Sequence, residues 1–309
     1  MKKLYSLLLL ISLTHITNAQ YRWEVGAMLG TASSLGEMGG KELTARKFIV
    51  DMQLQRIRSE QGLYVRRKLN KSFMWRIDFN YARLSGTDAL SLNPGRVGRN
   101  LSYRNNIFEL GTDLEWVFYK PKNIARLGGR RVDLQTYVFA GVAGFHHNPR
   151  TTYNGKTVSL RPLKTEGVAY SPWQVSIPAG LGLAYTIGRT LRIGAEVSYR
   201  KVFTDYIDDV RTVYRDPNTF TDPIAKAVAN RRGELDLNAD PTIIADPRNY
   251  GVVDGIAQKR GDPNNTDDYF FINFTAGYIL KGKNSFYKSK YRSITGRRGM
   301  KKRRVRAKF

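Results

Sequence analysis

The sequence has no cysteine and no apolar stretch long enough to cross a membrane as a helix. None of its 309 residues is cysteine, so we expect neither a disulfide nor the lipidated cysteine of a lipoprotein. The most apolar segment, Leu4–Leu13, is too short to span a bilayer, and no later segment reaches about 18 consecutive apolar residues. We therefore expect neither a disulfide-linked fold nor a helical membrane protein.

Histidine is also scarce, and this limits the enzymatic alternatives. Beyond the N-terminal segment the only histidines are His146 and His147. An outer-membrane acyltransferase or omptin-like protease would need a nucleophile or water activated by positioned histidines and carboxylates. His146 and His147, together with Asp205 or Asp208, could form such a site. Adjacent loop histidines are more often simple surface polar groups, which is the alternative interpretation.

The N-terminus has the three parts of a secretory signal. Lys2 and Lys3 precede the apolar segment, and Ala19 supplies a small residue before an expected cleavage site. We therefore expect a signal peptide at residues 1–19 and an exported mature protein.

Strict alternation of apolar and polar residues is clearest in Ser72–Leu84. Successive side chains of a strand point to opposite faces, so this segment would be a strand with one apolar, aromatic face. Such a face is typical of a strand that has lipid outside it and a polar barrel interior behind it. The expected lipid-facing residues are Phe73, Trp75, Ile77, Phe79 and Tyr81.

The rest of the chain predicts seven more strands, which makes an all-β protein. The eight candidates are about 23–30, 60–69, 72–84, 105–119, 132–145, 176–187, 191–203 and 268–280. Their connections alternate between short ones (70–71, 120–131, 188–190) and long ones (31–47 or more, 85–104, 146–175, 204–267). Outer-membrane barrels have short periplasmic turns and long extracellular loops. We predict an eight-stranded antiparallel outer-membrane β-barrel at 20–282.

Charged residues on the polar faces of these strands would share the barrel interior. Eight strands leave a lumen that side chains just fill, and buried charges must be paired. We therefore expect a plugged barrel, which disfavours a small solute channel. The acidic side chains could instead form a catalytic dyad or a proton path, but interior ion pairs are the favoured interpretation. The expected interior charges are Arg76, Asp78, Glu109, Asp113, Glu115, Arg192 and Glu196, with Glu24, Arg66 and Arg200 beside them.

The last long connection, 204–267, is too long to be a mere link between strands. A short helix is predicted at Pro223–Arg232, with Asp222 placed to cap it. Asp205, Asp208 and Asp209 could bind Ca²⁺ through their oxygens, although their spacing is not that of a calcium loop. Pairing with nearby arginines is the favoured interpretation, and no metal or cofactor is expected.

The C-terminal segment is strongly basic. The chain carries a formal net charge of +25, and thirteen cations lie after residue 280 without one Asp or Glu. Nucleic-acid binding is a poor interpretation in an exported protein. We expect 283–309 to be a periplasmic tail that binds a partner or an anionic surface, with a solvated extension as the alternative. The expected binding residues are Lys288, Lys290, Arg292, Arg297, Arg298, Lys301, Lys302, Arg303, Arg304 and Arg306.

Several segments flanking the strands resemble the PorG family, the small outer-membrane barrel of the type IX secretion system. The resemblance covers roughly 20–282 and departs from the family at 41–58 and in the long tail. The matching segments are Ser34–Gly40, Leu84–Asp88, Leu101–Leu110, Phe203–Val210, Arg260–Asp262 and Asp267–Phe270.

The resemblance implies a non-enzymatic anchor or assembly component of a secretion or gliding machinery. Its implied partners are outer-membrane lipid and periplasmic ring proteins of the PorK and PorN type. It implies no catalytic residues.

Overall fold

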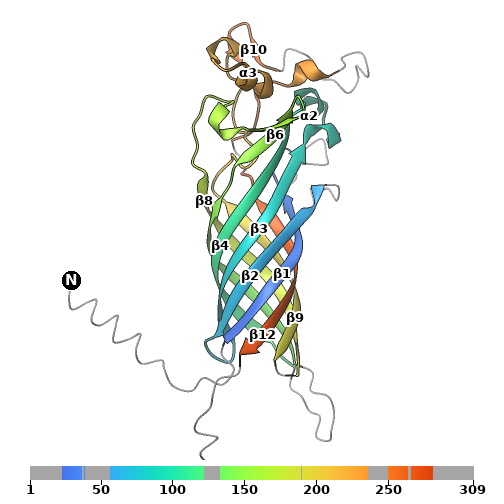
Figure 1. Ribbon diagram of the computed structural model, residues 1–309, viewed down its shortest axis with the longest axis vertical. Coiled ribbons are helices and arrows are strands. Elements are labelled where there is room, and N and C mark those ends of the chain that lie inside the picture. The colour runs from blue at the N-terminus through green and yellow to red at the C-terminus, as the bar shows by residue number, and fades with distance from the viewer. Residues whose placement is uncertain are drawn as a thin grey trace, which may run out of the picture.

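The structure, a computed structural model, is a tall barrel closed at one end by a folded cap (Figure 1). It describes residues 23–36, 38, 56–121, 133–188, 190–235, 250–263 and 266–280. The predicted signal peptide, the basic tail and, of the stretch 41–58 that departs from the PorG pattern, residues 41–55 lie outside the described residues.

Eight antiparallel strands form the closed wall, which confirms the predicted fold class. The wall follows chain order with β6 and β7 outside it, and the pairing of β3 with β4 closes the ring. The eight strands are β1 (Trp23–Ser34), β2 (Arg58–Lys68), β3 (Phe73–Thr87), β4 (Ser102–Tyr119), β5 (Leu134–His146), β8 (Trp173–Ile187), β9 (Leu191–Val202) and β12 (Tyr269–Leu280).

The first and last strands of the wall pair with each other along their whole length. Trp23 of β1 lies opposite Leu280 of β12, and Ser34 lies opposite Tyr269. The short connections therefore gather at one end of the barrel and the long ones at the other (Figure 1). This arrangement is that of an outer-membrane barrel with its long loops outside.

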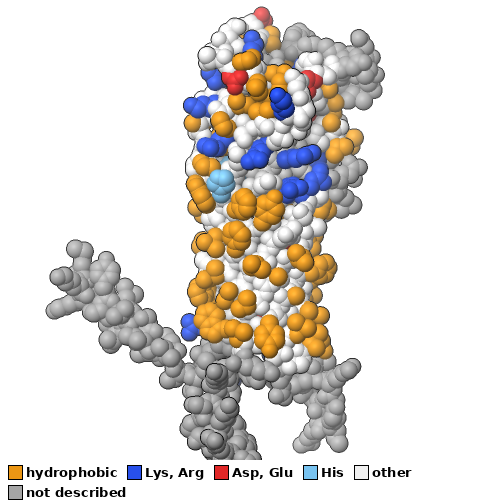
Figure 2. Space-filling view, viewed as in Figure 1, with side chains coloured by type: hydrophobic (Ala, Val, Ile, Leu, Met, Phe, Trp, Pro, Cys, Tyr) orange, Lys and Arg blue, Asp and Glu red, His pale blue; other side chains and the backbone are white. Residues whose placement is uncertain are grey.

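The outer wall is apolar because each strand keeps the alternation seen in its sequence. In β3 the predicted lipid-facing residues all point outward: Phe73, Ile77 and Phe79 are 37–48% exposed, and Trp75 and Tyr81 are partly covered. Figure 2 shows the resulting belt of hydrophobic side chains around the lower part of the barrel. A belt of this kind is typical of a barrel wall that faces lipid. No helix among the described residues combines the length and apolar character needed to cross a membrane.

The cap consists of short elements from three long loops, and we define it as residues 88–101, 147–172, 203–235 and 250–263. Helix α3 of this region begins as predicted, because the side chain of Asp222, the N-cap residue of the helix, accepts a hydrogen bond from the Ile224 amide. The predicted end at Arg232 was wrong, since Asn230 takes an extended conformation and ends the helix. The cap elements are η3 (Asp88–Leu90), α2 (Pro94–Arg99), β6 (Pro149–Tyr153), β7 (Lys156–Ser159), η4 (Arg161–Leu163), η5 (Pro217–Thr219), α3 (Pro223–Ala229), η6 (Arg232–Glu234), β10 (Val252–Val253) and β11 (Ile256–Ala257).

An apolar core fills the outer mouth of the barrel and continues into the cap. Inward-facing Leu84, Ile107 and Phe145 from the wall are fully buried. Ile207 and Val210 from the last loop and Val228 from α3 pack in the same cluster. Burial of such side chains contributes about 1.5–3 kcal/mol each. The cap is therefore part of the folded core and not a set of loose loops.

Candidate functional site

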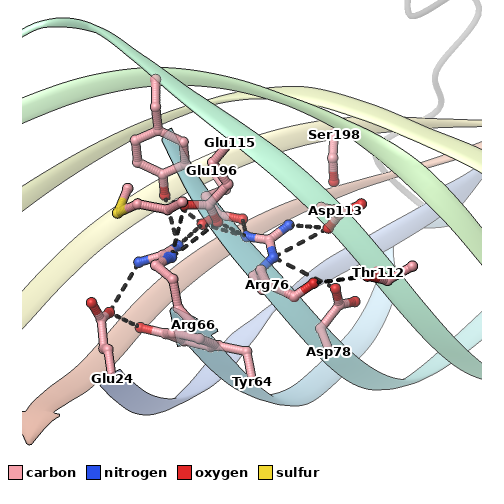
Figure 3. A network of polar contacts seen from close by, with 12 residues as sticks. Glu24, Tyr64, Arg66, Arg76, Asp78, Thr112, Asp113, Glu115, Glu196 and Ser198 are labelled. Atoms are coloured by element: carbon pink, nitrogen blue, oxygen red, sulfur yellow. Dashed lines mark hydrogen bonds and ion pairs between the residues drawn. The ribbon is translucent and has the colours of Figure 1, made fainter. Parts of the chain in front are cut away.

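A network of buried ion pairs crosses the middle of the barrel (Figure 3). At its centre, Arg76 of β3 lies 2.7 Å from Asp113 of the neighbouring strand β4. It also lies 2.7 Å from Glu196 of β9, which stands on the opposite side of the wall. The guanidinium plane covers the ring of Phe139 at 4.5 Å. One arginine thus links opposite walls of the barrel.

A second arginine collects carboxylates from three strands. Arg66 of β2 lies 2.8 Å from Glu115, 2.9 Å from Glu24 and 3.2 Å from Glu196. Tyr137 of β5 donates a hydrogen bond of 2.5 Å to Glu196. Because each carboxylate has a cation or hydroxyl beside it, the network offsets the cost of removing these charges from water.

A second level of contacts lies nearer the outer mouth. Tyr269 of β12 donates a hydrogen bond of 2.5 Å to Glu109 of β4, and these two strands also stand opposite each other. Arg200 of β9 lies 3.3 Å from the same carboxylate and over the ring of Phe271 at 3.9 Å. Opposite walls therefore touch through side chains at two heights. The lumen is filled by polar side chains below and by the apolar core above.

All of the predicted interior charges are buried. Arg192 lies 2.5 Å from Glu24, and Asp78 lies 3.5 Å from Arg76. The three acidic side chains weighed as a catalytic or proton-carrying cluster each have a tyrosine or arginine partner. The buried set is Arg76, Asp78, Glu109, Asp113, Glu115, Arg192 and Glu196.

The cap is held together by arginines that join its loops. Arg260, from the last loop, lies 2.9 Å from Glu166 and donates a hydrogen bond of 2.5 Å to the carbonyl of Asp209. Its own carbonyl accepts a hydrogen bond of 2.5 Å from Arg99, which forms a bidentate pair with Asp88 at 2.7 and 2.8 Å. Three loops are thus connected through two buried guanidinium groups.

The acidic start of the last loop is used for this internal bonding. Asp209 lies 3.8 Å from Arg260, and Asp205 lies 3.9 Å from Arg211, as the favoured arginine pairing predicted. Asp208 instead accepts hydrogen bonds from the backbone amides of Met38 and Val210. Within the described residues no group of three His, Asp or Glu side chains is arranged to hold a metal ion.

The two histidines lie in different surroundings. His146 packs against Trp173 with ring centroids 5.0 Å apart. His147 is fully buried, stacks on Tyr170 at 5.9 Å, and its Nε2 atom lies 3.1 Å from the carbonyl oxygen of Ser171. The interpretation of both as surface polar groups was therefore wrong for His147, which is part of the cap core.

Sequence comparison assigns the family. A domain of unknown function, DUF6089, matches residues 2–220, which is more than half of the chain. The chain belongs to the DUF6089 family. No curated protein matches the sequence. The DUF6089 assignment does not extend to the PorG family, so the resemblance to PorG remains a prediction.

Several solved outer-membrane proteins are similar to the DUF6089 barrel at low identity. Ail of Yersinia pestis, in complex with the heparin analogue sucrose octasulfate, is 10% identical, with 83% of this chain and 98% of that chain covered and a TM-score of 0.35. Neisserial surface protein A is 8% identical, with 84% and 97% covered and a TM-score of 0.40. OprG from Pseudomonas aeruginosa is 9% identical, with 84% and 96% covered and a TM-score of 0.34. At this level the likenesses carry no conclusion about what the DUF6089 chain does.

The sequence did not lead us to predict the tyrosines inside the barrel or the hydrogen bonds that join the loops of the cap. Tyr64 donates a hydrogen bond of 2.8 Å to Glu24, and Tyr137 and Tyr269 are inward and buried. A local signal exists for Tyr64, which lies between the outward-facing apolar residues Leu63 and Val65. The cap bonds of Arg99 and Arg260 join segments 161 residues apart, and no local pattern indicates them.

Two titrating groups of the DUF6089 cap should respond to acid in opposite directions. Burial lowers the pKa of His147 to about 4, from 6.5, so this group costs stability as the pH falls from about 6.5 to 4. Burial raises the pKa of Asp209 to about 6, from 3.8, so this group adds stability as the pH falls from about 6 to 3.8. In the wild type the two effects offset each other.

Single substitutions should therefore separate the two contributions to the pH dependence of cap stability. Relative to wild type, His147→Phe should gain cap stability on acidification from pH 6.5 to 4, and Asp209→Asn should lose it. Each group should change the free energy of unfolding by at most about 1.4 kcal/mol per pH unit. Hydrogen exchange of cap amides across this range measures both. Parallel pH curves for the three proteins would contradict the assignment.

Proposed function

We propose that this protein is a non-enzymatic anchor or assembly component in the outer membrane, within a protein-secretion machinery of the type IX kind. In this proposal the barrel fixes the protein in the membrane, and the basic tail contacts periplasmic ring proteins of the PorK and PorN type. The same role in a gliding machinery is part of this proposal.

The observation that carries the proposal is the filled lumen. Arg76 and Glu196 join opposite walls at 2.7 Å, and Tyr269 and Glu109 do so at 2.5 Å. An apolar core and a bonded cap then cover the outer mouth. A barrel filled in this way is suited to a fixed structural role, because solute passage would require breaking buried ion pairs.

The surroundings of the histidines give the enzymatic alternative little support. A general base must reach its proton and be oriented by a partner. His147 is buried, its Nε2 atom is at the carbonyl of Ser171, and its neighbouring ring is Tyr170. Asp208 is bonded to backbone amides instead. We therefore propose that neither histidine has a catalytic role.

Deleting Ser285–Phe309 tests the proposed contact with periplasmic partners. The truncated barrel should still fold, because all eight strands of its wall lie before residue 281. It should lose most of the periplasmic ring protein that crosslinking in intact cells captures on the full chain, because about ten cations near an anionic surface are lost. Identification of the captured proteins by mass spectrometry measures the effect.

A second variant keeps the full tail and changes its Lys and Arg residues to Gln. It separates the effect of losing the charge from the effect of losing the segment. Heat-modifiable gel mobility shows that both variants remain folded. Capture of ring proteins by the truncated chain at the wild-type level would reject the proposal. Loss of lipid or peptide turnover on changing His146 and His147 would favour the enzymatic alternative.

A further inference from the structure

A row of rings marks the outer edge of the apolar belt. Tyr81 of β3 lies opposite Phe108 of β4, with ring centroids 5.1 Å apart. Phe108 lies opposite His146 of β5, which lies opposite Trp173 of β8. One register line thus places rings on four adjacent strands. Aromatic girdles of this kind sit at the boundary between hydrocarbon and headgroups.

Three exposed arginines lie just beyond this row on neighbouring strands. Arg83 is two residues past Tyr81 on β3, and Arg104 is four residues beyond Phe108 on β4. Arg150 of β6 is the direct register partner of Arg104. At about 3.4 Å per residue and a strand tilt near 40°, Arg83 lies roughly 5 Å above Tyr81 of its own strand, and Arg104 lies roughly 10 Å above Phe108 of its own strand. That is the height of headgroup phosphates.

Basic side chains form a visible band at this height. Figure 2 shows Lys and Arg side chains gathered directly above the apolar belt on the face that it displays. No acidic side chain among the described residues forms an ion pair with Arg83, Arg104 or Arg150. By contrast, Lys201, near the outer end of β9, lies 2.9 Å from Asp268.

Placing like charges directly opposite each other on paired strands destabilises a sheet. Arg104 and Arg150 are in this position, and the diagonal neighbour Arg83 adds a third charge. An anion between the guanidinium groups would remove the repulsion. Guanidinium groups bind phosphate through paired hydrogen bonds, and their strand positions hold them in a fixed row.

We propose that Arg83, Arg104 and Arg150 form a binding site for the phosphate groups of a lipid A-type glycolipid in the outer leaflet. The acyl chains of this lipid lie against the apolar belt below the aromatic row, and its phosphate lies between the three side chains. The site would hold one glycolipid at a fixed position on the β3–β4–β6 face, independently of what the tail binds.

The test uses the full chain in phosphatidylcholine nanodiscs with bisphosphorylated lipid A, and native mass spectrometry counts the lipid A retained. The triple variant Arg83→Gln, Arg104→Gln, Arg150→Gln should bind lipid A about tenfold or more weakly. The matched control changes three exposed cap cations, Lys156, Lys164 and Lys226, to Gln and should bind as wild type. Heat-modifiable mobility confirms that each variant is folded.

The single variant Arg104→Gln gives a second measurement that does not depend on the triple variant. Without lipid A it should unfold at higher denaturant than wild type, because repulsion from Arg150 is relieved. With lipid A this order should reverse. Equal retention by wild type and the triple variant, equal loss in the control, or equal binding of dephosphorylated lipid A, phosphatidylglycerol or inorganic phosphate would each overturn the proposal.

Discussion

Replacing Arg76 by methionine is expected to lower the free energy of unfolding by about 3–5 kcal/mol. The substitution keeps a long side chain in place but removes the charge that Asp113 and Glu196 face at 2.7 Å each. Both carboxylates then remain buried without their main cation, and this cost exceeds the net worth of the original pairs. Urea titration in phosphatidylcholine vesicles, followed by tryptophan fluorescence, measures the change.

The matched control is Arg83→Met on the same strand. Arg83 faces outward, and in vesicles that contain only phosphatidylcholine its loss should change stability by no more than about 0.5 kcal/mol. The double variant Arg76→Met, Glu196→Gln should recover part of the loss, because one of the unpaired carboxylates is neutralised. A loss for Arg76→Met as small as that of the control would mean that the interior charges are solvated and not mutually dependent.

The second large effect concerns the lipid-facing wall. Ile77→Arg should cost about 2–4 kcal/mol, because it places a charge on the outer face of β3 in the middle of the apolar belt. Ile77 lies between Val65 and Thr112 of the adjacent strands, so the inserted charge has no acidic neighbour in register. Unfolding in vesicles and heat-modifiable mobility both measure it.

The variant Gln61→Arg is the control for the effect of depth in the bilayer. Gln61 is exposed on β2 opposite Tyr81, within the aromatic row, so the same charge there should cost only about 0–1 kcal/mol. Equal stabilities for the two arginine variants would contradict the position of the belt.

The barrel could be predicted from the sequence because period-2 alternation is a local signal. Phe73–Tyr81 shows it without interruption, and the strand ends in the structure lie within four residues of those predicted. The interior charges were identified by the same alternation, since Arg76 and Asp78 fall between outward-facing apolar residues. A closed barrel then requires them to meet, because eight strands leave them no other space.

The specific partners could not be predicted, because they depend on closure of the ring. Nothing local indicates that Arg76 reaches Glu196, 120 residues away, or that Arg99 reaches Arg260. The proposed phosphate-binding arginines, Arg83, Arg104 and Arg150, were missed for a different reason. Arg83 continues the outward face of an otherwise apolar strand, and its meaning appears only when the aromatic row fixes its depth.

The pairing of β1 with β12 constrains the order in which the barrel can assemble. The strand that closes the wall is the last one made, and the cations Arg192 and Arg200 of β9 also arrive late in synthesis. Until then, the first four strands carry Glu24, Glu109 and further carboxylates with only part of their compensating charge. A half-made wall would have to enter the lipid with these carboxylates lacking part of their partners. We therefore expect insertion to wait until the closing strand is made, so that ring closure, charge neutralisation and entry into the bilayer occur as one event.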